Sequence, residues 1–265
     1  MGWRNVLRHR DIPWLVDQTL GGSVIFPAAG HLSLGIEAIH QVCENDGIEM
    51  KGITLRDVDI KTALVVPDTD DGIEIRLRLS ETHRSEKDST WYGFAIESIT
   101  DGAWTLHCEG KISPIAGPAR KDPVNPADCS KLTQRVPSRR WYDAFKRVGF
   151  EYGPSFQKLG PIRTNNKLNC AAAGVRIVTE SGLIEGESRY ILHPSIVDAC
   201  MQLINISVHK GMHKEMPWGV VPISIEVSFY LPSEGFQEEG SAIAWTDDVD
   251  GRQLQYKFKV DSCRR

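Results

Sequence analysis

Two long apolar segments, each begun by a proline, constrain the fold of this chain more than any other feature. The first is PAAGHLSLGIEAIHQVCEN, from Pro27, and the second is PSIVDACMQLINISVHK, from Pro194. Proline suits the first position of a helix, where its missing N–H costs nothing. A helix that is apolar on nearly every side is normally enclosed by other structure. We therefore expect buried helices over residues 27–44 and 194–209.

Segments in which apolar and polar residues alternate follow each of these helices. Ile73, Ile75, Leu77 and Leu79 alternate with charged residues, and the later segments PISIEVSFYL and LQYKFKV have the same period of two. Three more segments are strand-like, namely ITLRDVDIKTALVV, WYGFAIESIT and AWTLHCEGKI. This period predicts sheets with one buried face. Together, the patterns predict an α+β fold with antiparallel sheets and the same order of elements in both halves.

A proline-rich stretch separates the two halves. PIAGPARKDPVNP, residues 114–126, holds four prolines and little apolar content, which is typical of a linker. We therefore expect an N-terminal unit over 1–113, a linker over 114–136 and a C-terminal unit over 137–265. The chain begins abruptly at Met-Gly, and we expect this to be an excised end.

Composition and charge exclude several classes of function. The net charge of −4 gives no bulk attraction to nucleic acid or anionic membranes. No apolar run is long enough to cross a bilayer, and no apolar segment makes the basic start a signal peptide. The six cysteines form no C-x-x-C pair, which argues against a zinc site and a disulfide scaffold. The histidines have no ligand-like spacing, so we expect no metal, and we expect a reducing, cytoplasmic location.

A carboxylate lies within the second apolar helix. Asp198 in SIVDACMQLI must be hydrogen-bonded, or have a raised pKa, or both, if that helix is buried. Gln202 follows four residues later, on the same helix face, where it can hold the carboxyl group. Local backbone groups would satisfy a lone buried aspartate equally well. The pairing with Gln202 favours a functional role for Asp198.

Two further motifs, both before the second helix in the chain, contain turn-forming residues. Tyr152-Gly153-Pro154-Ser155-Phe156 is by itself only a turn signal. The segment from Gly22 to Pro27, GSVIFP, leads from a strand into the first helix. N–H groups at that helix start can bind a polarised carbonyl oxygen, although most such turns are only structural.

Together these motifs resemble the dehydratase domains of polyketide synthases. That family carries H-x-x-x-G-x-x-x-x-P, then Y-G-P-x-F, then H-P-x-x-x-D-A-x-x-Q or a near variant. This chain matches the three motifs in order with Gly22 and Pro27, then Tyr152, Gly153, Pro154 and Phe156, then His193, Pro194, Asp198, Ala199 and Gln202. The lead-in WRNVLRHRDIPWL resembles the fungal highly reducing iterative branch. The short segment that usually opens such a domain is absent ahead of Trp3.

The resemblance implies a double hot-dog fold, in which each of two antiparallel sheets wraps a buried helix. It also implies syn-type elimination of water from a β-hydroxyacyl thioester, giving an α,β-unsaturated thioester. The family's histidine takes the α-proton and its protonated aspartate, here Asp198, helps the β-hydroxyl leave. The substrate arrives on the phosphopantetheine of an acyl carrier protein, so no separate cofactor is implied. The expected partners are that carrier, other domains of the same synthase and a second copy in a homodimer.

The catalytic histidine position holds a different residue. Counting back four residues from Gly22 reaches Gln18, and a neutral amide is not a useful proton acceptor near pH 7. The resemblance therefore implies a disabled or strongly impaired dehydratase. Gln18 is either an engineered change or a natural loss, and its amide can still hydrogen-bond a substrate. His31, one turn into the first helix, is a weak candidate for a substitute base, because a lone histidine in such a place is more often a packed residue. His9 and His193 are weaker candidates still.

Two other functions remain open at this point. One is a non-catalytic structural domain of the synthase, and the other is a related double hot-dog cyclase or thioester hydrolase. For carrier docking, exposed basic residues in SRRWYDAFKRVG are candidates, because carrier proteins of this family are acidic: Arg139, Arg140, Lys146 and Arg147. A solvated basic helix face explains any one of them equally well.

Overall fold

The computed structural model describes residues 1–82, 90–116, 131–230, 239–246 and 256–262. Most of the expected linker, residues 117–130, lies outside the described residues. Side-chain alternation was expected over residues 254–260; of these, 256–260 lie in a described strand, and their side chains are outside what the structure describes. Within the described part of the chain, no helix is long and apolar enough to cross a membrane.

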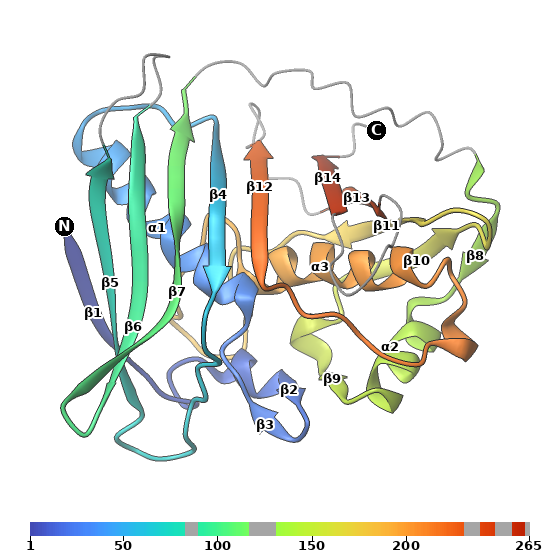
Figure 1. Cartoon of the computed structure of the whole chain (residues 1–265), viewed down its shortest axis with the longest axis horizontal. Helices are drawn as coiled ribbons and strands as arrows, with labels where there is room; N and C mark the ends of the chain where they lie inside the picture. The colour runs from blue at the N-terminus through green and yellow to red at the C-terminus, as the bar shows by residue number, and fades with distance from the viewer. Residues whose placement is uncertain (83–89, 117–130, 231–238, 247–255, 263–265) are drawn as a thin grey trace.

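The first buried helix, α1, is enclosed by a six-stranded antiparallel sheet (Figure 1). Helix α1 spans Ala28–Asn45, and Pro27 is its N-cap residue, one position earlier than expected. Leu32, Ile36 and Ile39 are fully buried in a core shared with the sheet. In spatial order the strands are β1 (Gly2–Leu7), β5 (Ile73–Thr82), β6 (Trp91–Thr100), β7 (Ala103–Ile115), β4 (Gly52–Ile60) and β12 (Ser224–Tyr230).

The second buried helix, α3, packs against a five-stranded antiparallel sheet. Helix α3 spans Pro194–Val208, with Pro194 in the first turn as expected, and every one of its residues is buried. The strands in spatial order are β14 (Tyr256–Ser262), β13 (Glu239–Thr246), β11 (Cys170–Arg176), β10 (Leu159–Thr164) and β8 (Gln134–Val136). A short amphipathic helix, α2 (Ser138–Arg147), precedes β9 (Phe150–Tyr152), and a single-turn helix, η4 (His213–Glu215), follows α3.

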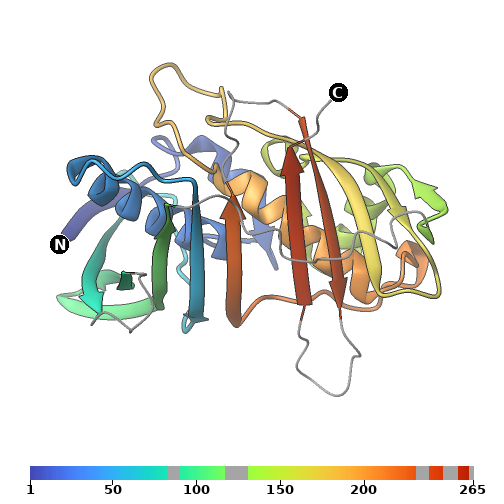
Figure 2. The same cartoon turned by 90° about the horizontal axis from the view of Figure 1, so that it is seen from above.

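The two sheets stand side by side, and the two central helices are in contact (Figure 2). Val197 and Met201 of α3 belong to the core around α1, whereas Ala199 and Leu203 of the same helix belong to the second core. Each helix is therefore wrapped by its own antiparallel sheet. This is the double hot-dog architecture that the sequence motifs implied.

Strand β12 corrects one expectation about the two halves. The segment PISIEVSFYL was expected to belong to the C-terminal unit, because it follows the second helix. In the structure, β12 pairs antiparallel with β4 and completes the first sheet. Its apolar residues Ile225, Val227 and Phe229 join the core around α1. The chain therefore crosses back after α3, and residues 137–265 serve both sheets.

A second correction concerns the strand expected over 53–66. Strand β4 ends at Ile60, and residues 61–66 are mostly irregular, with one bridge from Val65 to Ile25. Leu64 accepts a hydrogen bond from the backbone N–H of Phe26, which ties this segment to the start of α1. The apolar–polar alternation of the sequence therefore continues beyond Ile60, the true end of the strand. The residues that follow form a loop, and residues 61–64 of that loop line a cavity.

A small third sheet joins the N-terminal and C-terminal halves. It has the order β3 (Ser23–Val24), β2 (Gln18–Leu20) and β9 (Phe150–Tyr152). In its register Gln18 lies opposite Tyr152, and Leu20 lies opposite Phe150. Two residues that belong to separate sequence motifs are thus held side by side by backbone pairing.

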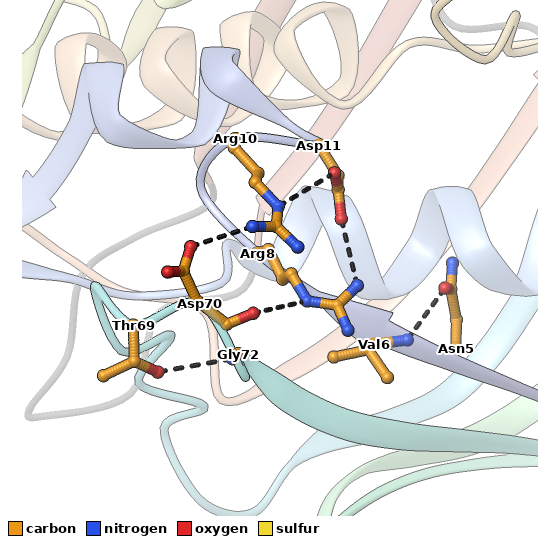
Figure 3. Close-up of polar contacts among 8 residues, drawn as sticks. All are labelled: Asn5, Val6, Arg8, Arg10, Asp11, Thr69, Asp70 and Gly72. Carbon is orange, nitrogen blue, oxygen red and sulfur yellow. Dashed lines mark hydrogen bonds and ion pairs between the residues drawn. The ribbon is translucent and has the colours of Figure 1, made fainter.

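The lead-in before Gln18 is held by polar contacts with the loop before β5 (Figure 3). Arg8 donates to the Asp70 carbonyl at 2.8 Å and to the Asp11 carboxylate at 3.2 Å, and Arg10 donates to the Asp70 carboxylate at 2.8 Å. Gly72 has φ +64°, and a Cβ there would lie 2.3 Å from the Leu7 carbonyl oxygen. These contacts fix where the chain enters the short helix η1 (Pro13–Asp17), which ends directly before Gln18.

Candidate functional site

A cavity of about 290 Å³ lies between β2, the start of α1, the loop after β4 and helix α3. Its walls are mainly apolar, with Phe26, Leu64, Met201 and Ile204 among the lining residues. Polar residues also line it, among them Gln18, His31, Tyr152, Asp198 and Asn205. An apolar pocket with a few convergent polar groups is the usual form of a small-molecule site.

Gln18 and Asp198 meet in this cavity. The Gln18 side-chain Nε2 donates to the Asp198 Oδ1 at 3.2 Å. The other amide atom, Gln18 Oε1, is buried and has no hydrogen-bond partner among the described residues. The two side chains thus lie together, as the resemblance implied.

Asp198 is a buried carboxyl group on α3. It is 5% exposed, and Gln202 Nε2 donates to its Oδ2 at 2.7 Å, as the spacing of four residues predicted. Burial raises the pKa of Asp198 to about 6, although the hydrogen bonds from Gln202 and Gln18 favour the ionised form. The predicted rise in the Asp198 pKa is therefore confirmed.

Gln202 connects Asp198 to the rest of the second core. Its Nε2 also donates to the Phe156 carbonyl at 3.1 Å, and its Oε1 accepts from the Tyr142 hydroxyl at 3.2 Å. That hydroxyl in turn accepts the backbone N–H of Leu159 at 3.3 Å. The polar atoms of Gln202 are satisfied, so the network fixes the orientation of the Asp198 carboxyl.

The Tyr152–Phe156 motif is attached to the strand that carries Gln18. Gly153 donates its backbone N–H to the Asp17 carbonyl at 2.6 Å, and Ser155 donates its N–H to the Asp17 carboxylate at 2.8 Å. A Cβ on Gly153 would lie 2.4 Å from the Asp17 carboxylate oxygen, so only glycine fits. Sequence reasoning missed Asp17, whose only signal was its place next to Gln18.

The other motif residues support the cavity to different degrees. Pro27 and Tyr152 line it, and burial of the Tyr152 hydroxyl raises its pKa well above the usual value. Gly22 lies outside the lining, in the turn between β2 and β3, with φ +82°. Pro154 begins the short helix η3 (Pro154–Phe156), and Phe156 is a fully buried core residue whose carbonyl holds Gln202.

Of the three histidines considered earlier, only His31 lies at the cavity. His31 is 1% exposed, and burial, with a smaller effect of His107, lowers its pKa to about 3. An imidazole with so low a pKa is a weak proton acceptor, which argues against His31 as a substitute base. His193 caps α3 through its Nδ1, which accepts the Ser195 N–H at 3.2 Å, and His9 contacts the Val66 carbonyl at 3.0 Å.

No metal-binding cluster is found in the described part of the chain: no three or more His, Cys, Asp or Glu side chains gather there. The basic residues expected at a docking surface all lie on α2. Arg139, Arg140 and Lys146 are exposed, whereas Arg147 is engaged with the His213 carbonyl at 2.6 Å.

Comparisons with known proteins agree on one family. The family model described as "Polyketide synthase dehydratase N-terminal domain" matches residues 120–262, and "Polyketide synthase dehydratase domain" matches residues 1–98. The reducing polyketide synthase DEP5 of Alternaria brassicicola is 36% identical over 94% of this chain. Prosolanapyrone synthase of Alternaria solani is 34% identical over 97% of it. The matched regions cover 11% and 10% of those two proteins, so the chain spans about a tenth of their length.

Solved structures show the same fold. The dehydratase domain from the CurF module of curacin polyketide synthase superposes with a TM-score of 0.75 at 20% identity, covering 98% of this chain and 86% of that one. Two inactive mutants of the CurK dehydratase, one with histidine changed to phenylalanine and one with aspartate changed to asparagine, each give a TM-score of 0.73 at 21% identity. They cover 99% and 100% of this chain, and this chain covers 91% and 94% of them.

Proposed function

Because this chain belongs to the polyketide synthase dehydratase family, we propose that its cavity binds a β-hydroxyacyl thioester between Gln18 and Asp198. The reaction of such a site breaks the α C–H bond and the β C–O bond, forms the α,β double bond and releases water. The hydrogen bond from Gln18 to Asp198 is the observation that carries this proposal, since it joins the two candidate positions within one apolar cavity.

Asp198 is the proposed general acid. A carboxyl group with a pKa of about 6 stays protonated in roughly a tenth of the molecules at pH 7, and that proton can go to the departing hydroxyl. Gln202 and its partners hold the carboxyl in one orientation. The apolar walls of the cavity keep the carboxyl desolvated, which is the cause of the raised pKa.

Gln18 occupies the proposed position of the general base, but its side chain cannot accept the α-proton of the substrate. Its amide is not a proton acceptor near pH 7, and its N–H donation to Asp198 favours the ionised carboxylate over the acid form. General-base catalysis typically contributes ~10²–10⁴-fold, so we expect dehydration to be impaired by about that factor. A CurK dehydratase in which a histidine is changed to phenylalanine is an inactive mutant, which supports the expectation.

Gln18 also favours a second candidate function, that of a non-catalytic structural domain within a synthase. The two origins of Gln18 separate at the parent gene: a histidine codon at position 18 means an engineered change, and a glutamine codon means natural loss. In either case the domain is proposed to act beside other domains of the same synthase. The acyl chain would arrive on the phosphopantetheine of a carrier protein, with no other cofactor.

The direct test is to restore the base. In a Gln18→His variant, a β-hydroxyacyl pantetheine thioester should lose water, and mass spectrometry detects the mass difference. The protein with Gln18 should leave the same thioester unchanged over the same time. Rapid dehydration by the protein with Gln18 would contradict the proposed role of this position. A silent Gln18→His variant, with a substrate that suits the parent synthase, would favour the structural role.

A further inference from the structure

The chain returns from the second half to the first sheet over residues 216–223, and this crossing segment forms one wall of the cavity. It lies between η4 and β12, outside any helix or strand, and in Figure 1 it is the ribbon that leads into the start of β12. The residues of it that line the cavity are Val220, Val221, Pro222 and Ile223. Because no backbone ladder holds the segment along its length, contacts from neighbouring elements must set its position.

Asn205 of α3 makes the first of these contacts. Its Nδ2 donates to the Val220 carbonyl at 3.1 Å, and its Oδ1 accepts the Val220 N–H at 2.7 Å. The side chain is 6% exposed and lines the cavity. One amide thus engages both backbone groups of a single residue, as a neighbouring strand would. Asn205 therefore fixes both the place and the orientation of Val220.

Two more contacts hold the crossing segment on either side of Val220. His209, at the end of α3, donates from Nε2 to the Trp218 carbonyl at 2.8 Å, and the two rings pack edge to face with centroids 4.6 Å apart. The backbone N–H of Ile60 donates to the Ile223 carbonyl at 3.0 Å. The segment is thus tied to α3 and to the end of β4, and the contact from Asn205 lies between the other two.

Helix α3 connects this wall to the proposed acid. Asp198 and Asn205 are seven residues apart, hence on one face of the helix and about 10 Å apart along its axis. Met201 and Ile204 lie between them in the chain, and both line the cavity. A chain whose β-carbon lies at Asp198 and which follows this apolar face reaches the crossing segment at Val220.

The chemistry of the wall suits a hydrocarbon chain. The backbone N–H and carbonyl of Val220 are engaged by Asn205, and the carbonyl of Ile223 is engaged by Ile60. Pro222 has no N–H to offer. A pantetheine arm carries amide groups, which lose free energy when they leave water without new hydrogen-bond partners. The acyl chain has no such groups, so it loses nothing against this wall and gains from burial.

We propose that the crossing segment contacts the distal part of the acyl chain, and that Asn205 is the positioning residue that sets this contact. The inference rests on the proposed function, because it takes the β-hydroxyacyl thioester as the ligand. Each CH₂ group buried against the wall should tighten binding about fourfold. The position of Val220 therefore determines how strongly the site prefers a long acyl chain to a short one.

The test measures chain-length preference in the protein with Gln18, in which slow turnover preserves the ligand. The probes are the pantetheine thioesters of β-hydroxybutyrate, which is too short to reach the wall, and of β-hydroxydecanoate. Calorimetry gives the ratio of their dissociation constants. Val220→Ala shortens the side chain at the wall and should lower the preference for the decanoyl probe roughly threefold to tenfold. Asn205→Leu is similar in size but loses both hydrogen bonds, and it should lower the same ratio.

Asn165→Leu is the matched control for the loss of an asparagine that holds backbone groups. Asn165 donates from Nδ2 to the Lys131 carbonyl at 2.7 Å, and its Oδ1 accepts the Lys167 N–H at 2.9 Å. It lies outside the cavity lining, so its replacement should keep the chain-length preference. Hydrogen exchange gives a second measurement: the decanoyl probe should slow exchange of the Val220 amide in the unmodified protein, and the butyryl probe should not.

The outcomes separate this inference from the proposed function. If the unmodified protein binds neither thioester, the proposed function is wrong, and this inference with it. If both bind, but Val220→Ala weakens them equally, the wall contacts the pantetheine arm and the assignment to the acyl chain is overturned. If Val220→Ala lowers the preference but a folded Asn205→Leu variant does not, Asn205 is not the positioning residue. If Asn205→Leu does not fold, Val220→Ala and the exchange of the Val220 amide decide the question.

Discussion

Gln18 and Asp198 lie 180 residues apart in the chain and are joined by a hydrogen bond of 3.2 Å from the glutamine amide to the carboxylate. The backbone pairing of β2 with β9 delivers Gln18 to this place, and the buried helix α3 delivers Asp198. Because Gln18 donates to the carboxylate, it lowers the proton affinity of the group that the proposed reaction needs in its protonated form.

A Gln18→His variant should have a bell-shaped pH profile for dehydration. Activity requires a neutral imidazole and a protonated Asp198, so the rate should rise through an imidazole pKa near 6.5 and fall through the pKa of the acid. Loss of the Gln18 donor removes one of the hydrogen bonds that lower the Asp198 pKa, so that pKa should lie above its present value of about 6. Rates from pH 5 to 9 measure both limits.

A second change in the Gln18→His variant provides the control. Asp198→Asn should reduce turnover by roughly 100-fold or more, because it removes the acid and keeps the shape of the side chain. The CurK relative with aspartate changed to asparagine is likewise an inactive mutant. Turnover that is unaffected by Asp198→Asn would assign the proton to another group.

Burial of Asp198 should also make stability depend on pH. The folded pKa is about 6, above the unfolded value of 3.8, so the folded state binds the proton more tightly. The contribution of Asp198 to the free energy of unfolding is therefore fully present below pH 3.8 and is lost as the pH rises through about 6. The difference of about two pH units between the folded and unfolded pKa of Asp198 corresponds to ~3 kcal/mol in the free energy of unfolding.

Asp198→Asn is the matched control for this effect, because it does not titrate. Urea unfolding of both proteins between pH 4 and pH 8 gives the difference in their free energies of unfolding. That difference should shift by up to ~3 kcal/mol in favour of Asp198→Asn as the pH rises. A difference that is constant over this range would mean that Asp198 is ionised in the folded protein throughout.

The two central helices and the site carboxylate could be predicted from local patterns. The helices expected over 27–44 and 194–209 were found at Ala28–Asn45 and Pro194–Val208. An apolar segment of that length is a local signal, since it needs enclosure wherever the partner strands come from. Asp198 was recognisable because a carboxylate among apolar residues requires a compensating partner, and Gln202 stood one helical turn away.

The features that sequence patterns did not predict all depend on distant pairing. Alternation shows that residues 224–230 form a strand, but it carries no information on whether β4 or another strand is the neighbour. The contacts of Asp17 with Gly153 and Ser155 span more than 130 residues, and no periodicity reports them. His31 Nδ1 has no hydrogen-bond partner among the residues that the structure describes, and this too depends only on what surrounds the ring in space.

Gly153→Ala should damage the site through Asp17. The new methyl group would lie 2.4 Å from the Asp17 carboxylate oxygen, so Asp17 must move and its hydrogen bond to the Ser155 N–H is lost. We expect a loss of about 1–3 kcal/mol in the free energy of unfolding and weaker thioester binding. Gly174→Ala is the control, because its added Cβ would lie 3.8 Å from the Gly240 carbonyl oxygen, an ordinary contact, and Gly174 lies outside the cavity. Equal effects of the two substitutions would show that Asp17 does not constrain this turn.

Charge reversal on α2 should weaken binding of an acidic carrier protein. Arg139 and Lys146 are exposed at this helix, and neither forms an ion pair among the described residues. Arg139→Glu or Lys146→Glu should each weaken binding roughly threefold to tenfold at low salt, mainly by slowing association. Lys51→Glu is the control, since Lys51 lies on the other half of the molecule, before β4.

Surface plasmon resonance with the holo carrier domain of the parent synthase measures the association and dissociation rates. The effect of the α2 variants should shrink as salt is raised, because exposed charges are screened. If Lys51→Glu weakens binding as much as the α2 variants do, net charge rather than a docking surface on α2 controls the encounter.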